Sequence, residues 1–155
     1  MSWKSPTGHS TPTNWVWPEW SYDEDIVSFA YIYVPLTSWS NFLELLMSPA
    51  ILCNKIRFYI ATTHANITLV DIDIYYKDNW YDVYEGTFTL AGWNEKIISG
   101  GSFAVSKTRI RFYNSSVGAT RMARLHEFDF NQLTMRPLVN GSLVGNSLVG
   151  KGLVR

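Results

Sequence analysis

The chain has 155 residues, with 13 Lys and Arg against 13 Asp and Glu, one cysteine and 46% hydrophobic residues. This hydrophobic fraction excludes a disordered chain, and the length suits a single domain. Because the net charge is zero, we expect neither a nucleic-acid partner nor attraction to an anionic membrane. No apolar run approaches the ~18 residues of a membrane span, so membrane insertion is not expected. Cys53 has no partner for an internal disulfide and is interpreted as a buried apolar residue.

The N-terminal segment is rich in Pro, Ser, Thr and Trp. Residues 1–21 show neither helical nor strand periodicity, and they predict an arm that wraps the central domain. An exposed indole ring can fill a pocket on a partner, and we therefore expect interface residues at Trp15, Trp17 and Trp20. The segment has no apolar signal-peptide core, so we expect synthesis in the cytoplasm without a signal peptide.

The central segment, residues 22–135, alternates between apolar and polar side chains. In residues 69–76, aliphatic side chains alternate with two aspartates, which is the period of a strand with one buried face. Comparable runs predict strands over residues 28–34, 42–47, 55–60, 81–85, 96–99, 109–113 and 122–131. The last run changes phase and predicts a β-bulge near His126 and Glu127. About eight short strands predict an all-β antiparallel sandwich, with Trp80 in its core.

The C-terminal segment has low complexity. Residues 136–155 repeat a Leu-Val pair every five residues, separated mostly by Gly, Ser and Asn. This period fits neither a helix nor a strand, and one coil of a five-residue β-helix cannot bury its own leucines. Left free, such a tail would be a flexible linker. We expect it to contact its own domain or, as the preferred alternative, a neighbouring subunit. The expected interface residues are Leu138, Leu143, Leu148 and Leu153.

Three segments carry an ordered set of motifs. Residues 20–30 contain Tyr-Asp-Glu-Asp followed by a serine and an aromatic residue. Residues 55–59 and 73–83 form two strand patterns, the second with Trp-x-x-Val, and residues 108–113 and 123–130 form a closing pair with an acidic residue. In this order the segments resemble the discoidin-like family, also called coagulation-factor type C or galactose-binding-like domains. The resemblance implies an eight-stranded antiparallel jelly roll whose loops at one end carry a ligand site.

The same resemblance implies a structural Ca²⁺ in the early acidic loop. The matching residues are Asp23, Asp25, Ser28 and Glu127. Carboxylates with a hydroxyl and backbone carbonyls are the oxygen ligands that Ca²⁺ takes. Glu24 stands where the family usually has glycine, and we prefer the alternative of a solvated acidic turn with Glu127 paired to an arginine. Such an ion would be structural, and no other cofactor is required.

The sequence has no pattern for catalysis. His9, His64 and His126 lack metal-ligand spacing, and no nucleophile elbow or phosphate-binding glycine loop occurs. We therefore expect no catalytic residues and no enzyme activity. The late arginines are expected to pair with acidic residues rather than to contact nucleic acid. These arginines are Arg109, Arg111, Arg121 and Arg124, and their expected partners are Asp71, Asp73, Glu127 and Asp129.

The sequence supports two hypotheses for the function of the protein. The main hypothesis is a structural protein of a multi-subunit assembly, a bacteriophage virion component such as a capsid decoration or tail protein, held by its terminal arms. Its partners would be further copies in a homo-oligomer or other virion proteins, and it would reside in the extracellular particle. The alternative is a carbohydrate-binding module that recognises glycans through aromatic residues in the end loops.

Overall fold

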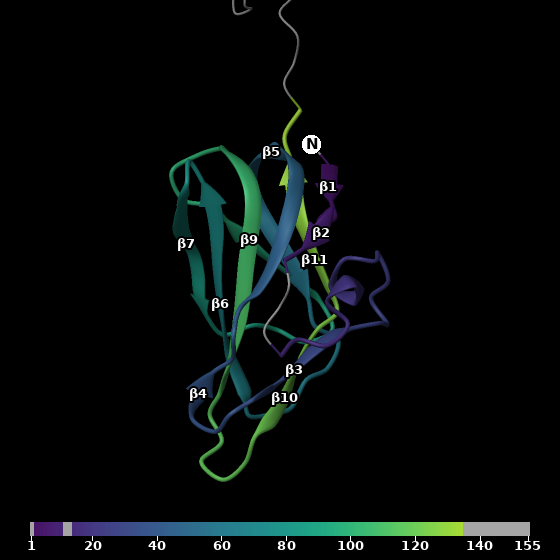
Figure 1. Ribbon diagram of the computed structural model, residues 1–155, viewed down its shortest axis with the longest axis vertical. Coiled ribbons are helices and arrows are strands. Elements are labelled where there is room, and N and C mark those ends of the chain that lie inside the picture. The colour runs from purple at the N-terminus through teal and green to yellow at the C-terminus, as the bar shows by residue number, and fades with distance from the viewer. Residues whose placement is uncertain (1, 11–13, 135–155) are drawn as a thin grey trace, which may run out of the picture.

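The computed structural model describes residues 2–10 and 14–134, in which the chain forms eleven strands and one short 3-10 helix (Figure 1). The elements are β1 (Ser2–Lys4), β2 (Gly8–His9), η1 (Pro18–Ser21), β3 (Ala30–Val34), β4 (Ser38–Trp39), β5 (Leu43–Tyr59), β6 (Ile67–Tyr76), β7 (Asn79–Gly86), β8 (Trp93–Ile97), β9 (Phe103–Asn114), β10 (Arg121–Leu125) and β11 (Glu127–Gln132). The all-β prediction is confirmed. Within the described residues, no helix is long and apolar enough to cross a membrane.

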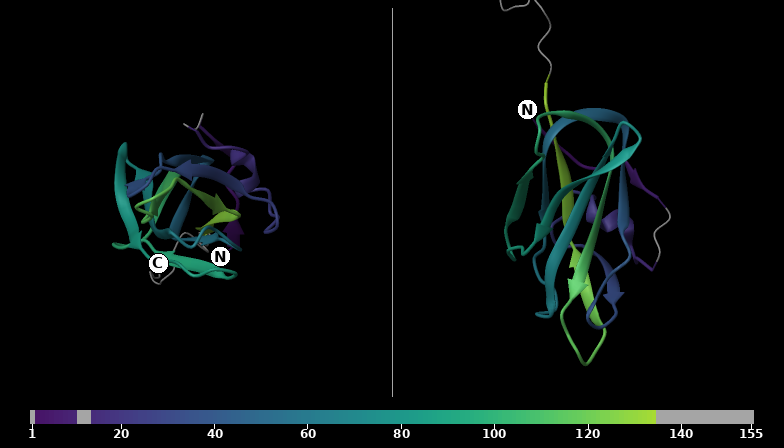
Figure 2. Two further views of the ribbon diagram at one scale, coloured as in Figure 1. Left: turned by 90° about the horizontal axis from the view of Figure 1, so that it is seen from below. Right: turned by 90° about the vertical axis from the view of Figure 1, so that its left-hand side faces the viewer.

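Most strands belong to one large antiparallel sheet. Its main path runs β1-β11-β5-β9-β6-β7, while β2 and β8 also pair with β5, and β4 pairs with β9. Strands β3 and β10 form a separate two-stranded sheet. Viewed along the long axis, the strands enclose a common interior (Figure 2), as in a jelly-roll sandwich. The expected sandwich is therefore present, with short strands added to the eight that were predicted.

Strand β5 combines two predicted strands into one. The sequence predicted separate strands over residues 42–47 and 55–60, whereas the structure has a single strand of 17 residues. Its register with β9 shifts between Leu46 and Ile51, where the chain is exposed at residues 48–50. Such an irregularity bends a strand, and β5 curves over the end of the sandwich that carries the N-terminus (Figure 1).

The predicted bulge at His126 is a change of sheet. The prediction of one strand over residues 122–131 is wrong, because β10 pairs with β3 whereas β11 pairs with β5 and β1. His126 lies between them, and its backbone N–H donates to the Tyr59 carbonyl at 3.0 Å while its Nδ1 accepts the Ala61 N–H at 3.2 Å. Burial, followed by the charge of Arg124, lowers the pKa of His126 to about 4. The phase change in the sequence thus marks a buried corner.

The core is filled by the inward side chains of the alternating runs. On β6, Val70, Ile72 and Ile74 are fully buried, as the period of two predicts. Asp71 and Asp73 on the other face are buried too, at 7% and 8% exposure, so the prediction of a single buried face is only partly right. The largest buried side chains are Phe58, Phe112, Phe128 and Phe130. Burying each of them stabilises the fold by roughly 1.5–3 kcal/mol.

The N-terminal arm is part of the sandwich rather than a segment outside it. Strand β1 covers the edge of β11, and β2 pairs with β5. Trp15 is only 6% exposed, and its Nε1–H donates to the Asn41 carbonyl at 3.0 Å. An open edge of β11 would leave unpaired backbone groups, which β1 satisfies. These pairings could not be predicted from the sequence, because strands of two or three residues are too short to show a period.

Candidate functional site

The β5–β6 loop and the loop that follows β7 lie at the end of the sandwich opposite the N-terminus (Figure 1). Residues of both loops line a pocket. We call it the end-loop pocket, and its volume is about 290 Å³. Its lining includes Thr63, His64, Thr68, Thr87, Phe88 and Leu90. The phenyl ring of Phe88, the imidazole of His64, three aliphatic side chains (Ala65, Ile67 and Leu90) and three hydroxyls therefore surround a hollow that no Asp, Glu, Lys or Arg lines.

Hydrogen bonds hold both loops of this pocket in place. The buried Asn94 side chain fixes the second loop, since its Oδ1 accepts the Thr89 N–H at 2.8 Å and its Nδ2 donates to the Thr89 carbonyl at 3.0 Å. In the first loop, His64 Nδ1 accepts the Asn66 N–H at 3.1 Å, which fixes the ring and leaves Nε2 as the donor. The Ala91 N–H donates to the Ile60 carbonyl at 2.8 Å and ties the loops together. The pocket is preorganised.

A second hollow, of about 260 Å³, lies on the side of the sandwich. We call it the side pocket, and its lining includes Trp3, Glu24, Arg57, Trp93, Glu127 and Asp129. Arg57 is fixed by Asp129 Oδ2, which accepts from Nη2 at 2.7 Å and from Nε at 2.8 Å. Its guanidinium carbon lies 3.8 Å from the ring centroid of Trp93 and 4.4 Å from that of Trp3. The sequence did not predict this pocket, because its walls come from β1, β5, β8 and β11.

The acidic loop before β3 carries three of the predicted calcium ligands. Asp23 Oδ2 accepts the Ser28 hydroxyl at 2.6 Å, and the same hydroxyl lies 3.2 Å from the Asp25 carbonyl oxygen. Asp25 uses Oδ1 to accept the Val27 N–H at 2.9 Å. Glu24 has a φ of 66°, the left-handed conformation that the glycine of the family would favour. The loop therefore keeps its turn despite the departure from the family pattern.

Glu127, the fourth predicted ligand, lies buried beside this loop with 2% of its surface exposed. Its Oε1 accepts the backbone N–H of Phe128 at 3.3 Å, while Oε2 has no hydrogen-bond partner. Burial, followed by the charge of Asp129, raises the pKa of Glu127 to about 7. The expected pairing with an arginine is wrong. The charge of Asp23 also contributes to this raised pKa, so the two carboxylates lie near each other. A buried carboxylate oxygen without a hydrogen-bond partner is a suitable ligand for a cation.

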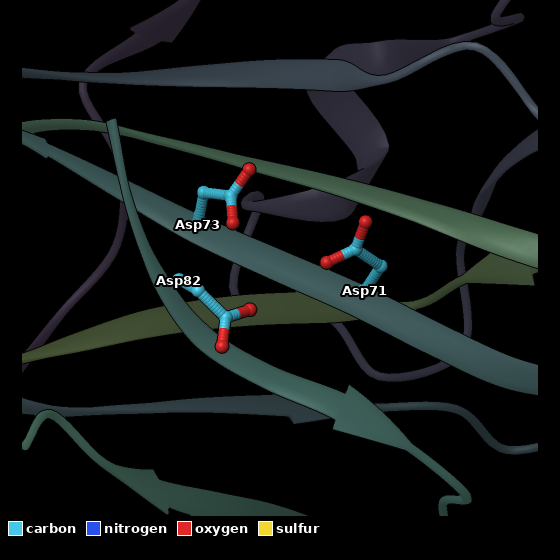
Figure 3. A group of neighbouring side chains, drawn as sticks. All are labelled: Asp71, Asp73 and Asp82. Carbon is cyan, nitrogen blue, oxygen red and sulfur yellow. The ribbon is translucent and has the colours of Figure 1, made fainter. Parts of the chain in front are cut away.

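Three other carboxylates converge on β6 and β7 (Figure 3). Oxygens of Asp71, Asp73 and Asp82 lie within 4.8 Å of one another. Arg111 Nε is 2.8 Å from Asp71 and Arg109 Nε is 2.7 Å from Asp73. Partial burial, followed by the charges of Asp73 and Asp71, raises the pKa of Asp82. Because two of the three carboxylates already have arginine partners, we assign this group to the packing of the sheet surface.

The arginine prediction is confirmed for Arg109 and Arg111 only. Arg124 donates to the Thr62 hydroxyl at 2.8 Å instead, and among the described residues neither Arg121 nor Arg124 forms an ion pair. The prediction that Trp80 lies in the core is also wrong. Its half-buried ring packs on Arg109, whose guanidinium carbon lies 4.3 Å from the ring centroid.

The predicted interface tryptophans separate into two kinds. Trp15 belongs to the core of its own domain, so the interface prediction is wrong for this residue. Trp17 and Trp20 are 45% and 36% exposed, with ring centroids 4.4 Å apart. For these two the interface stays a prediction. The predicted contacts of Leu138, Leu143, Leu148 and Leu153 lie outside the described residues.

No protein-family model and no curated protein matches the sequence, but solved structures match the fold. The module CBM32-3 of a family 31 glycoside hydrolase from Clostridium perfringens has a TM-score of 0.58 at 14% identity, over 84% of this chain and 91% of that chain. The family 32 carbohydrate-binding module of Clostridium perfringens NanJ was solved in complex with galactose. Its TM-score is 0.55 at 15% sequence identity, over 83% of this chain and 90% of that chain. An F5/8 type C domain from Bacteroides fragilis has a TM-score of 0.57 at 11% sequence identity, over 85% of this chain and 93% of that chain.

These likenesses establish the discoidin-like fold of this chain, which the sequence resemblance implied. It is the fold of F5/8 type C domains and of family 32 carbohydrate-binding modules. None of these three is described as a virion component or a homo-oligomer. The virion role, its localisation and the homo-oligomer therefore stay predictions without support from the comparison.

Proposed function

We propose that this chain is a carbohydrate-binding module that binds a glycan at the end-loop pocket and catalyses no reaction. The observation that carries the proposal is the combination of Phe88 with three threonine hydroxyls in the end-loop pocket, whose loops are held in place by hydrogen bonds. Support also comes from the fold, since a module with the same fold was solved with galactose. This alternative hypothesis is better supported than the virion hypothesis.

The chemistry of the end-loop pocket suits a neutral sugar. A pyranose has an apolar face of C–H groups, which packs on an aromatic or aliphatic side chain such as Phe88 or Leu90. Its hydroxyls exchange hydrogen bonds with threonine hydroxyls and with the Nε2–H of His64. No carboxylate or cation lines the pocket to select a charged sugar. We expect dissociation constants in the micromolar-to-millimolar range, because the pocket is shallow and small.

The test is a glycan array followed by calorimetry with the full chain. Leu90→Ala is the diagnostic variant, and Leu36→Ala is its control, since the two leucines are 50% and 47% exposed. We expect the Leu90 variant to weaken binding about three- to tenfold, from the loss of apolar contact. The Leu36 variant should bind normally. Absence of binding to every glycan at millimolar concentration would contradict the proposal.

We further propose that the acidic loop holds a structural Ca²⁺. Asp23, the Asp25 carbonyl, Ser28 and Glu127 would supply the oxygens. The bound ion would cross-link the loop to β11 and neutralise the buried carboxylate. The support is the unpartnered Oε2 of Glu127 beside a loop whose oxygens already gather around the Ser28 hydroxyl.

A further inference from the structure

The side pocket is built mainly on strands, and the acidic loop closes part of it. Trp3 comes from β1, Arg57 from β5, Trp93 from β8 and Asp129 from β11, while Glu24 belongs to the acidic loop. Four strands therefore fix four of its walls. Side chains held by packed strands keep a defined position, and this preorganisation favours the binding of a specific ligand.

The aromatic wall is held in place and still accessible. Arg57 is stacked against both indoles and anchored by Asp129, so it cannot swing away without losing both contacts. Tyr59 supports Trp93 from the side, with ring centroids 5.4 Å apart in an edge-on arrangement. Trp93 nevertheless remains 36% exposed. An indole that is immobilised but open is a suitable surface for the C–H face of a sugar ring.

The polar groups of the pocket are rich in acceptors and poor in donors. The single hydroxyl of Ser5 lies 3.3 Å from Asp129 Oδ1 and 3.5 Å from Glu24 Oε2, and it can donate to only one of them at a time. Two of the five N–H donors of Arg57, on Nε and Nη2, are directed to Asp129 Oδ2. A ligand that brings several hydroxyl donors would complete these bonds, and charged acceptors give the stronger hydrogen bonds.

We infer that the side pocket is a second saccharide site, which takes one sugar unit and discriminates against sugars that carry a carboxylate. The saccharide class rests on the proposed function of the chain, whereas the discrimination rests on the pocket itself. Its volume of about 260 Å³ is at the lower end for ligand pockets, so it suits one ring rather than a long chain.

Charge decides which sugars are accepted. Besides the buried Glu127, four carboxylates belong to the pocket and its acidic loop, against the one guanidinium of Arg57, and the four are Asp23, Glu24, Asp25 and Asp129. A Ca²⁺ bound in the loop would add two positive charges and still leave the carboxylates in excess. A uronic acid would bring another carboxylate into this field, whereas a neutral sugar or an amino sugar would not.

The experiment follows binding of galactose, galactosamine and galacturonic acid to the full chain by two-dimensional NMR of the tryptophan indole N–H groups and by calorimetry. We expect galactose and galactosamine to shift the Trp3 and Trp93 signals, and galacturonic acid to bind at least about tenfold more weakly. Glu24→Gln should reduce this difference, whereas Glu85→Gln, at an exposed position on β7 outside the pocket, should not.

Variants of the two pockets separate this inference from the proposed function. Trp93→Ala should abolish the side-pocket event and leave the end-loop event, and Trp93→Phe should retain part of it. Leu90→Ala should do the reverse. One outcome would overturn the second site and leave the proposed function intact. In it, Leu90→Ala weakens saccharide binding, Trp93→Ala leaves the affinity unchanged, and saccharide does not shift the indole signals of the unmodified protein. Tighter binding of galacturonic acid than of galactose at Trp93 would overturn the discrimination, and no saccharide binding at all would overturn both proposals.

Discussion

Asp73 on β6 lies directly opposite Asp82 on β7, so that two carboxylates face each other across one antiparallel pair. Only Asp73 has an arginine partner, Arg109. Like charges in this position are destabilising, and the raised pKa of Asp82 reflects partial burial and the charges of Asp73 and Asp71. The sheet surface therefore carries a repulsion that its ion pairs only partly offset.

Asp82→Asn should stabilise the protein at neutral pH by about 0.2–1 kcal/mol, because it removes the unpartnered carboxylate. A raised folded-state pKa means that the native state binds the proton more tightly than the unfolded state. The repulsion is therefore present at neutral pH and fades as the pH falls through the pKa of Asp82. Urea denaturation at several pH values measures the difference.

Asp78→Asn is the matched control, since Asp78 lies in the adjacent turn with a φ of 63° that asparagine also tolerates. It should leave stability nearly unchanged. A gain for Asp82→Asn that grows on acidification would contradict the electrostatic explanation.

Trp15→Ala should lower the free energy of unfolding by about 3–5 kcal/mol, because it empties a core position. Trp17→Ala should cost less, about 1–2 kcal/mol, because its ring is already 45% exposed and loses only its contacts with Trp20 and Tyr31. Denaturant titration of both variants distinguishes an arm that is packed into the domain from one that is free. Equal and small effects would mean that residues 14–21 do not contribute to the core.

Cys53 should resist thiol reagents in the folded protein. Burial raises the pKa of its thiol to about 11, which lowers the thiolate fraction at pH 8 about a hundredfold, and the side chain is fully buried. Labelling with a chromogenic disulfide reagent should be slow in buffer and complete at once in denaturant. Rapid labelling of the native protein would show that this part of β5 opens readily.

Asn94→Ala should loosen the loop after β7. Removing the buried amide leaves the Thr89 backbone groups without their partners and should cost about 1–3 kcal/mol of stability. Under the proposed function it should also weaken glycan binding about three- to tenfold, because the end-loop pocket loses its preorganisation. Asn79→Ala serves as control, since that side chain makes one exposed local bond to the Lys77 carbonyl. Unchanged affinity in the Asn94 variant would argue against a site in these loops.

Calcium should raise the melting temperature of the full chain, and magnesium should do so much less, because Ca²⁺ suits irregular oxygen cages. Free calcium at 100 times its dissociation constant adds about 2.7 kcal/mol of stability. Asp23→Asn should weaken this effect, whereas Asp78→Asn should preserve it. A melting temperature that is the same in calcium and in chelator would contradict the calcium proposal.

The sequence predicts the part of this fold that depends on local periodicity. Val70, Ile72 and Ile74 alternate as a strand must, and they are buried. What it does not predict depends on pairings between distant segments. The side pocket needs Trp3 next to Arg57 and Arg57 next to Trp93, and only the register of four strands brings them together. The corner at His126 could be predicted only in part. The alternation of apolar and polar residues changes phase there in the sequence, but this does not show that β10 and β11 belong to different sheets.

The pairing of Ser2–Lys4 with residues 130–132 has a consequence for biosynthesis. Lys4 is synthesised 126 residues before its partner Phe130, so this edge of the sheet cannot form until β11 has left the ribosome. At ~5–20 residues per second, the nascent β1 spends on the order of ten seconds without that partner. Pairing of β1 with β11 is therefore a late step of folding, and the edge of β11 stays open until it occurs.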